Sequence, residues 1–341
     1  MRRVLFITAA SHTHGQGHYF RTLRIASEAA NLAEVVVFCN QPMSTQEVRD
    51  YDLPLIPFDL NSPESLFCDF ELHENDVFWF DIPDDCYYLI SYFSEYSQKI
   101  VSINMFEARS DSIVEDVYIY PCFRKTNCEF NERYKTTFMS GSDFIIVDDK
   151  FFFEPDSKKT AGRILVSMGG ADPMGVTIPL IKQLNGIMRS DLNFRVVLPK
   201  TVKKRDVVNS LSIRPTIELF DFDGLDFATA LKQSQYAVIN GGITRYECIA
   251  AETYSIAISM HDVQYGLTAL STAYGFGCNF GVINEFELTE LVSYIEGLSL
   301  TSVFPGPVSN VVGLRQSAAL KTFNTVMEVI NSDESEIPIN N

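Results

Sequence analysis

The sequence predicts an α/β protein of two halves, each built on a parallel β-sheet with helices on both faces. The chain has 341 residues, which is more than one hydrophobic core usually organises and favours two domains. Short apolar runs alternate with segments of helical period, as in proteins with parallel sheets. An apolar run, a glycine-containing loop and a helix follow one another at Val4–Thr8 and again at Ile164–Met168, so each half has its own opening strand.

A charged stretch separates the two halves. Asp148–Arg163 contains Pro155 and Gly162 and has neither a helical nor a strand period, which is typical of a linker. The predicted boundaries are an N-terminal domain at 1–148, a linker at 149–162, a C-terminal domain at 163–331 and a polar tail at 332–341.

In the first half, the predicted strands are short runs rich in β-branched or aromatic residues. After Val4–Thr8 they are Glu34–Cys39, Pro54–Phe58, Asp76–Asp81, Lys99–Ile103, Val117–Tyr120 and Asp143–Val147. Apolar residues at helical spacing predict helices after the first and the fourth of these strands, at His18–Ala26 and Tyr87–Tyr96.

The second half follows the same logic after its opening strand. The further predicted strands are Phe194–Leu198, Thr216–Phe220, Tyr236–Asn240 and Ser255–Met260. The predicted helices are Thr177–Met188, Phe227–Ser234, Arg245–Ala251, Leu267–Tyr274, Leu288–Leu298 and Val312–Ile330.

Charge and cysteine content restrict the possible functions. The 44 acidic and 27 basic residues leave a net charge of −17, which disfavours nucleic acid and anionic membranes as partners. No apolar run is long enough for a membrane helix, and no signal peptide is visible at Met1–Arg3. The seven cysteines form no C-x-x-C pair and are expected to be reduced, so we predict a cytoplasmic protein. The oligomeric state is left open.

The first glycine loop carries the clearest chemical signal. Three of the five histidines, His12, His14 and His18, lie in or beside the loop that follows the opening strand. A histidine at the carboxyl end of a parallel strand is well placed as a general acid or base, which is the role predicted for His18. Two alternatives stay open. In one, His18 only caps its helix and His12 and His14 are solvated. In the other, His12 and His14 hold a metal, although no Asp, Glu or Cys accompanies them locally.

This loop is not a dinucleotide fingerprint. Gly15-x-Gly17-x-x-Phe20 lacks the third glycine of G-x-G-x-x-G. The next strand ends in Cys39-Asn40, where a ribose-binding acid would stand. A bound dinucleotide is therefore disfavoured, and no cofactor is predicted.

Three polar loops follow strands of the second half: Ser167–Pro173, Asn240–Glu247 and His261–Gln264. Two of them place Gly-Gly before a helix, where free backbone N–H groups can bind phosphate, so together they predict a phosphate-binding rim. Glu247 lies one helical turn past Gly242 and is suited to accept both ribose hydroxyls. Alternatively, it is a solvated acid that favours the first turn of its helix.

These motifs resemble those of a family of nucleotide-sugar enzymes. Gly15–Arg21 (GQGHYFR) is similar to the G-x-G-H-x-x-R of the nucleotide-sugar hydrolase of pseudaminic acid biosynthesis and its spore-coat polysaccharide relatives. Ile164–Thr177 resembles that family's strand and GG-x-D-P-x-x-x-T loop, and Asn240–Glu247 its GG-x-T-x-x-E segment. Gln264 matches the Gln of its A-x-N-Q loop. The resemblance implies the GT-B fold, with two Rossmann-like domains facing across a cleft.

The resemblance also implies roles for single residues. His18 would be the general base, since a neutral imidazole can take a proton near pH 7. Arg21, one turn later, would orient His18 or meet phosphate. The residues implied to bind the sugar are Gly15, Gly17, Arg21 and Asp81. The residues implied to bind the nucleotide are Ser167, Gly169, Gly170, Asp172, Gly241, Gly242, Thr244, Glu247 and Gln264. Backbone N–H groups would stabilise the leaving diphosphate, so no metal is expected.

By this resemblance we expect hydrolysis of a UDP-linked amino or deoxy sugar to free sugar and UDP, for a surface glycan. The alternative is a GT-B glycosyltransferase that passes the sugar to a glycan or lipid-linked acceptor, and His18 would serve either reaction. A third class is a non-catalytic sensor of nucleotide sugars. The chain departs from the family's pattern twice: Val263 replaces the Asn before Gln264, and Pro83 stands where the Tyr of an Asp-x-Tyr loop would follow Asp81.

Overall fold

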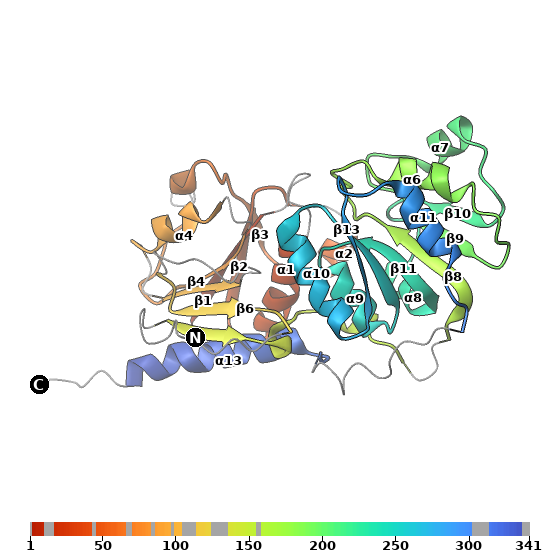
Figure 1. Cartoon of the computed structure of the whole chain (residues 1–341). Coiled ribbons are helices and arrows are strands. Elements are labelled where there is room, and N and C mark those ends of the chain that lie inside the picture. Colours follow the sequence, from red (N-terminus) through yellow and green to blue (C-terminus); the bar gives the residue numbers. More distant parts are fainter. Residues whose placement is uncertain are drawn as a thin grey trace, which may run out of the picture. The chain divides into compact units, whose positions relative to one another are not determined.

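The computed structural model of the chain describes residues 2–9, 17–42, 46–65, 70–82, 86–96, 99–103, 114–123, 136–154, 158–301 and 314–335. The chain divides into two compact units (Figure 1). Unit 1 comprises Met1–Ile146 and Val312–Asn341, and unit 2 comprises Val147–Val311. Each unit contains one parallel sheet with helices, so the predicted α/β class is confirmed.

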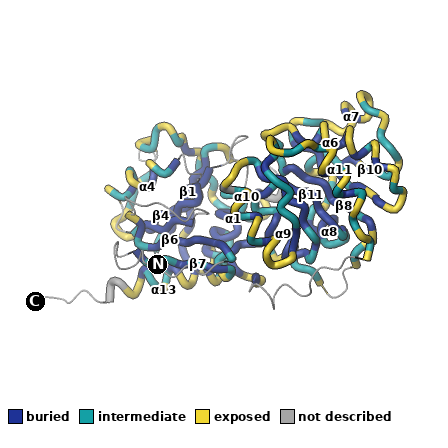
Figure 2. The backbone as a smooth tube through the Cα atoms, viewed as in Figure 1, coloured by how far each residue is buried: buried dark blue, intermediate teal, exposed yellow. Residues whose placement is uncertain are grey.

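Unit 1 is built on a seven-stranded sheet of order β3-β2-β1-β4-β5-β6-β7, in which all neighbours run parallel. The strands are β1 Arg3–Thr8, β2 Glu34–Cys39, β3 Leu55–Pro57, β4 Val77–Asp81, β5 Lys99–Ile103, β6 Val117–Tyr120 and β7 Thr137–Ser140. The central strands are buried (Figure 2), which explains why they are continuous apolar runs in the sequence.

Helices cover both faces of this sheet. They are α1 Gly17–Ala29, α2 Gln46–Arg49, α4 Tyr88–Phe93 and α13 Ala318–Ser335, with 3-10 turns η1 Pro63–Ser65 and η3 Ser142–Phe144. Alternate residues of β1 point to opposite faces. Val4 and Phe6 join the core under α1 and α13, whereas Leu5 and Ile7 join the core under α4.

The last helix packs in unit 1, alongside α1 (Figure 1). Val326 and Ile330 of α13 share a core with the sheet, and the Phe323 ring stacks on that of Trp79 in β4, with centroids 6.1 Å apart. This corrects the predicted boundaries, which assigned the helix to the C-terminal domain and began the tail at 332, since α13 continues to Ser335. Helical period reveals an apolar face but not which sheet that face covers.

The seventh strand also differs from the prediction. Asp143–Val147 is not a strand: η3 occupies its beginning, and residues 145–147 belong to neither sheet. The edge strand is instead β7, whose sequence TFMS has one buried residue, Met139, and therefore no apolar run. Ile145, Ile146 and Val147 are buried nonetheless, so this apolar run indicated burial rather than strand pairing.

Unit 2 is built on a six-stranded parallel sheet of order β10-β9-β8-β11-β12-β13. The strands are β8 Thr160–Ser167, β9 Asn193–Val197, β10 Ile217–Phe220, β11 Ser234–Asn240, β12 Tyr254–Ser259 and β13 Gly277–Val282. The predicted linker at 149–162 thus already contains the first residues of β8. The edge strand β13 was not predicted, because its sequence GCNFGV has two glycines and no clear alternation.

The helices of unit 2 are α6 Thr177–Leu184, α7 Lys204–Ser210, α8 Phe227–Gln233, α9 Thr244–Ala250, α10 Asp262–Ala273 and α11 Leu288–Glu296, with the 3-10 turn η4 Asp149–Phe151. Local chemistry defines several of their starts. Asp226 accepts a hydrogen bond from the Thr229 amide and caps α8, and Glu287 forms a capping box with Glu290 at α11. The sequence did not predict α7, because it buries a single residue, Val207.

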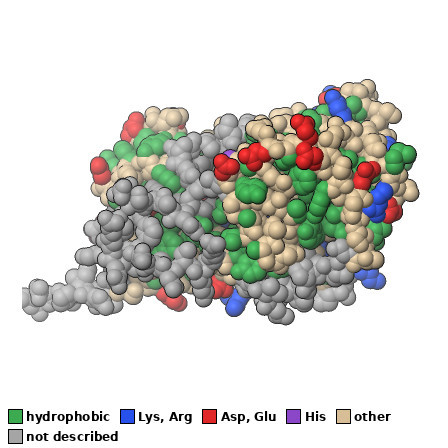
Figure 3. Space-filling model, viewed as in Figure 1, with side chains coloured by type: hydrophobic (Ala, Val, Ile, Leu, Met, Phe, Trp, Pro, Cys, Tyr) green, Lys and Arg blue, Asp and Glu red, His purple; other side chains and the backbone are tan. Residues whose placement is uncertain are grey.

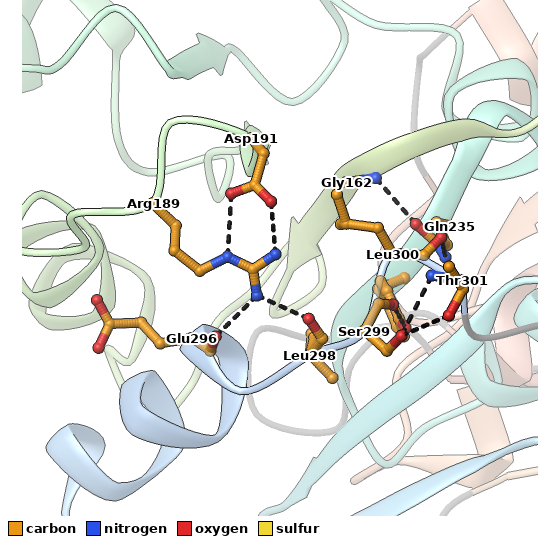
Figure 4. Close-up of polar contacts among 10 residues, drawn as sticks. Gly162, Arg189, Asp191, Gln235, Glu296, Leu298, Ser299, Leu300 and Thr301 are labelled. Atoms are coloured by element: carbon orange, nitrogen blue, oxygen red, sulfur yellow. Dashed lines mark hydrogen bonds and ion pairs between the residues drawn. The ribbon is translucent and has the colours of Figure 1, made fainter.

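A polar network holds the chain after α11 against the amino-terminal edge of the sheet (Figure 4). Arg189 donates two hydrogen bonds to Asp191 and two more to the carbonyl oxygens of Glu296 and Leu298, at 2.8 and 2.7 Å. Arginine thus satisfies carbonyls that the end of α11 leaves without partners. This edge of the sheet is opposite the edge that carries the glycine loops, so the network has a structural role.

Lys159 ties the start of β8 to the ends of two other elements. Its Nζ donates hydrogen bonds to the carbonyl oxygen of Ala251, after α9, at 2.7 Å and to Thr253 Oγ1, before β12, at 2.6 Å. The same nitrogen lies 5.1 Å from the ring centroid of Phe153. Burial lowers the pKa of Lys159 to about 7.

We expect the free energy of unfolding to rise between about pH 7 and pH 10.5, because the unfolded chain keeps Lys159 protonated up to its ordinary pKa of 10.5 while the folded chain has released the proton. Below pH 7 both states hold the proton, and this contribution no longer changes. Urea unfolding of the wild type and of Lys159→Met at several pH values measures the effect. The rise should be smaller in the variant, and identical pH dependence in the two proteins would contradict the expectation.

Candidate active site

Each sheet has one point where the strand order changes direction. Ligands of open α/β sheets bind there, beside the carboxyl ends of the strands. In unit 1 this point lies between β1 and β4, and in unit 2 between β8 and β11. The loops that leave these four strands are therefore where each unit is expected to carry functional residues.

In unit 1, three side chains meet at this position. His18 lies in the first turn of α1, and Asp81 is the last residue of β4, paired in register with Thr8 of β1. His18 Nδ1 is 2.7 Å from Asp81 Oδ1. Arg21, one turn later on α1, donates from Nε to Asp81 Oδ2 at 2.7 Å and from Nη2 to Asp81 Oδ1 at 2.6 Å. The bidentate arginine fixes the carboxylate beside the imidazole.

The Asp81 carboxylate selects the histidine tautomer. Burial acts to raise the pKa of Asp81, but the charge and hydrogen bonds of Arg21 and then His18 bring that pKa below its ordinary value. An ionised carboxylate only accepts hydrogen bonds, so Nδ1 of His18 carries the hydrogen. The neutral imidazole then has its lone pair on Nε2, where it can accept a proton. His18 is 20% exposed, and its two partners are buried, so solvent reaches the histidine alone.

This geometry changes the role expected of Asp81. The resemblance implies that Asp81 binds the sugar, but both of its oxygens are bonded to His18 and Arg21 and none of its surface is exposed. A residue that positions His18 fits this geometry better than a sugar ligand. Of the two roles expected of Arg21, orienting His18 fits better, since Arg21 is only 5% exposed. Gly17 is the first residue of α1. Three other residues of this loop lie outside the described residues: His12, His14 and Gly15.

In unit 2, the loop after β8 depends on two glycines. Gly169 has φ +80°, a left-handed conformation that glycine adopts readily. A Cβ at Gly170 would lie 2.9 Å from Cε2 of Phe222, so a side chain does not fit there. Ser167 Oγ accepts a hydrogen bond from the Gly169 amide at 3.4 Å. The loop can therefore bring bare backbone close to a ligand, as the predicted phosphate rim requires.

Asp172 has a contact that the sequence did not predict. Its carboxylate oxygens accept hydrogen bonds from the amides of Val176 at 3.0 Å and Thr177 at 2.9 Å, at the start of α6. Both oxygens are thus used to hold the helix start. Asp172 thus stabilises the turn that leads into α6, and its role as a nucleotide ligand, implied by the resemblance, stays a prediction.

The second glycine loop follows β11 and is joined to the first. Asn240 Nδ2 donates a hydrogen bond to the carbonyl oxygen of Met168 at 3.1 Å. A Cβ at Gly241 would lie 3.0 Å from Thr268 Cγ2, so a side chain at this turn would be tightly packed. The structure therefore brings the two predicted Gly-Gly segments together at one edge of the sheet.

Three further predicted nucleotide ligands surround this second loop. Thr244 is the first residue of α9, and Glu247 follows one turn later with 6% exposure. Gln264 of α10 accepts a hydrogen bond from the Met260 amide at 2.8 Å through Oε1, which also lies 3.3 Å from the Cβ position at Gly241. Gln264 thus supports the loop. Nucleotide contacts of these three side chains stay predictions.

Two basic residues beside the glycine loops were not predicted. Arg245, 1% exposed, donates from Nη1 to the carbonyl oxygens of Gly241 at 2.7 Å and Gly242 at 2.8 Å. Lys200 follows β9, and its amide donates to the Gly170 carbonyl at 3.0 Å. Both residues come within a few positions of a strand end at the same edge, but nothing in the sequence marks the burial of Arg245. The phosphate rim predicted from glycines alone contained no cation.

Cavity size does not locate this site. A small pocket at the carboxyl edge is lined by Met168, Asp172, Pro173, Met174, Val176, Asn240, Ile258, Ser259, Met260 and Ile283. A pocket of about 460 Å³ lies elsewhere in unit 2, beside β9 and β10, and includes Arg163 and Arg195 but no glycine-loop residue. On the face seen in Figure 3, the described acidic and basic side chains are scattered, so charge does not mark a surface there either. The candidate site is instead predicted from strand order and loop chemistry.

Within the described ranges, no group of three or more His, Cys, Asp or Glu side chains is arranged to hold a metal ion. Among the helices described there, none combines the length and the apolar character needed to cross a membrane.

Comparison with known proteins identifies two distant relatives in sequence. No family model matches it. The spore coat polysaccharide biosynthesis protein SpsG of Bacillus subtilis is 22% identical over 260 residues, which are 73% of this chain and 75% of that protein. An uncharacterized protein of Methanocaldococcus jannaschii is 22% identical over 279 residues, 77% of this chain. The alignment spans 56% of that relative, so the chain matches little more than half of its length.

Solved structures share the architecture over nearly the whole chain. The glycotransferase of kitacinnamycin has a TM-score of 0.64 at 14% identity, covering 98% of this chain and 99% of that one. Staphylococcus aureus MnaA, solved with UDP, has a TM-score of 0.64 at 12% identity, with 97% of each chain covered. The chain has the GT-B fold. The fold class predicted from the resemblance is thereby confirmed. The distant homology to SpsG supports the spore-coat part of that resemblance, and the hydrolase part stays a prediction.

Proposed function

We propose that this GT-B protein is a glycosyltransferase that moves a sugar from a UDP-sugar to an acceptor in the synthesis of a surface glycan or its lipid-linked precursor. Unit 2 would hold the nucleotide through its two glycine loops. The acceptor oxygen would attack the anomeric carbon as the bond from that carbon to the diphosphate breaks. UDP would leave with the electron pair, and the acceptor proton would pass to His18 Nε2.

The observation that carries this proposal is the contact between the buried Asp81 and the partly exposed His18, beside the carboxyl ends of β1 and β4. With Nδ1–H held by Asp81, the imidazole presents Nε2 as the acceptor of a proton, which is what a general base needs. The paired Gly-Gly loops at the matching position of unit 2 support a diphosphate ligand, because backbone N–H groups at such turns favour anions.

Transfer is preferred to the hydrolysis expected from the sequence. The same base would activate water or an acceptor hydroxyl, so His18 does not distinguish the two reactions. The kitacinnamycin enzyme, similar over nearly the whole chain, is described as a glycotransferase, and none of the descriptions quoted above names a hydrolase. The kinship with a polysaccharide biosynthesis protein supports a glycan as acceptor.

Release of UDP from a panel of UDP-sugars, with and without glycan and lipid-linked acceptors, tests the proposal on the full-length protein. We expect release to depend on an acceptor and a new glycosidic product to appear by mass spectrometry. Release at the same rate without any acceptor would identify a hydrolase instead. If calorimetry detects no binding of UDP or of any other nucleoside diphosphate, the role in nucleotide-sugar chemistry is wrong.

A further inference from the structure

Arg245 is a buried cation with no carboxylate partner among the described residues. Its Nη1 bonds the carbonyl oxygens of Gly241 and Gly242, and its Nη2 donates to the Tyr246 hydroxyl at 2.9 Å. The guanidinium also lies over the Tyr246 ring, with Cζ 4.1 Å from the centroid. Its Nε is buried and has no hydrogen-bond partner in the described part of the chain. The hydrogen bonds and the ring contact that this charge makes there are therefore all with neutral groups.

A full charge in such a place is unfavourable unless an anion balances it. Removing an ion from water is costly, and carbonyl dipoles offset that cost only in part. The nearest acid along α9, Glu247, is two positions further on, and residues at this spacing do not face each other on a helix. The arginine thus indicates that an anionic ligand completes the charge balance beside it.

The loop geometry shows on which side that anion would lie. A trans peptide points its C=O and its N–H in opposite directions. The carbonyl groups of Gly241 and Gly242 both turn toward Arg245, so the amides of Gly242 and Ile243, in the same two peptide planes, point away from it. Among the described residues, nothing accepts a hydrogen bond from either amide. Successive outward amides form a concavity that binds anions.

We infer that Arg245 is a positioning residue for the diphosphate of the nucleotide ligand. It holds the carbonyl groups of Gly241 and Gly242 so that the amides of Gly242 and Ile243 face the ligand. Its positive charge lies on the opposite side of the loop and balances the negative charge of the diphosphate. The inference rests on the proposed function, since it takes the anion to be a nucleoside diphosphate.

The test compares the binding of UDP and of uridine to Arg245→Met by titration calorimetry. We expect the variant to bind UDP at least about tenfold more weakly, the equivalent of one charge-assisted hydrogen bond, and uridine almost as the wild type does. Arg245→Lys keeps the charge but not the planar fork, so it should recover part of the UDP affinity. Glu247→Ala is the matched contrast. Both UDP and uridine contain the ribose that Glu247 is predicted to bind, so this variant should lose the same affinity for each.

Arg163→Met serves as the neutral control, since Arg163 lies near the amino-terminal edge of the sheet and bonds Gln233. It should bind UDP as the wild type does. A folded Arg245→Met with UDP affinity within about twofold of the wild type would overturn the inference. Equal losses for UDP and uridine would also overturn it, because they indicate a structural role. Failure of the wild type itself to bind UDP would instead reject the proposed function. If Arg245→Met does not fold, Arg245→Lys provides the test by the same criterion. A loss of affinity for UDP but not for uridine supports the inference, and equal losses overturn it.

Discussion

His18→Asn should lower the turnover number by about 10²–10⁴-fold, the usual contribution of general acid–base catalysis. Asparagine keeps a side-chain N–H that can bond Asp81, so the surrounding packing should survive, but it offers no nitrogen that accepts a proton. UDP affinity should hardly change, because the predicted nucleotide contacts belong to unit 2. Initial rates of UDP release at saturating donor and acceptor, together with calorimetry, measure both quantities.

His73→Asn is the matched control, since His73 is exposed in the loop before β4 and should be replaceable without loss of turnover. Near wild-type turnover in His18→Asn would reject His18 as the base. Loss of activity with a chelator, in the wild type, would point instead to a metal held by the loop histidines. That alternative was left open by the sequence.

Asp81→Ala should lower the free energy of unfolding by about 3–5 kcal/mol, because it leaves the Arg21 guanidinium buried without its counterion. The effect should depend on pH. The pKa of Asp81 lies below its ordinary value of 3.8 in the folded chain, so its contribution to stability is complete above pH 3.8 and is lost as the pH falls through the folded value. Urea unfolding of the wild type and the variant at neutral and acidic pH measures the loss.

Two further variants separate charge from packing at this position. The double variant Asp81→Ala, Arg21→Met removes both charges and should recover part of the lost stability. Asp81→Asn preserves volume but no longer fixes the Nδ1–H tautomer, so turnover should fall even where the fold holds. A single Asp81→Ala variant as stable and as active as the wild type would contradict the assigned role.

The sequence predicted the sheets well wherever strands are buried on both faces. Glu34–Cys39 and Val117–Tyr120 match β2 and β6 to the residue, because a strand covered on both sides must be a continuous apolar run. The edge strands β7 and β13 were not predicted, because an edge strand needs little apolar surface to pair with its neighbour. The helix α13 was predicted as a helix, but its partner depends on contacts that no local pattern encodes.

In the candidate site, too, some residues could be predicted from the sequence and others could not. His18 and the Gly-Gly loops were found from short motifs, because their chemistry depends on neighbours in the chain. Asp81 lies 63 positions after His18, and its contact with that imidazole requires knowing that β4 pairs with β1. Arg245 was missed for another reason. A charged side chain in a helix is expected at the surface, and only its burial marks it as unusual.

The position of α13 has a consequence for how the protein forms during synthesis. One face of the unit 1 sheet is completed by a helix at 318–335, so the strands of this unit leave the ribosome long before the segment that covers them. All of unit 2 is made in between and can fold first, although it comes second in the chain. The final step is the packing of α13 on the unit 1 sheet, and the chain has a natural probe for it. Phe323 of α13 stacks on Trp79, the one tryptophan of the sequence, so tryptophan fluorescence should change when α13 packs on unit 1.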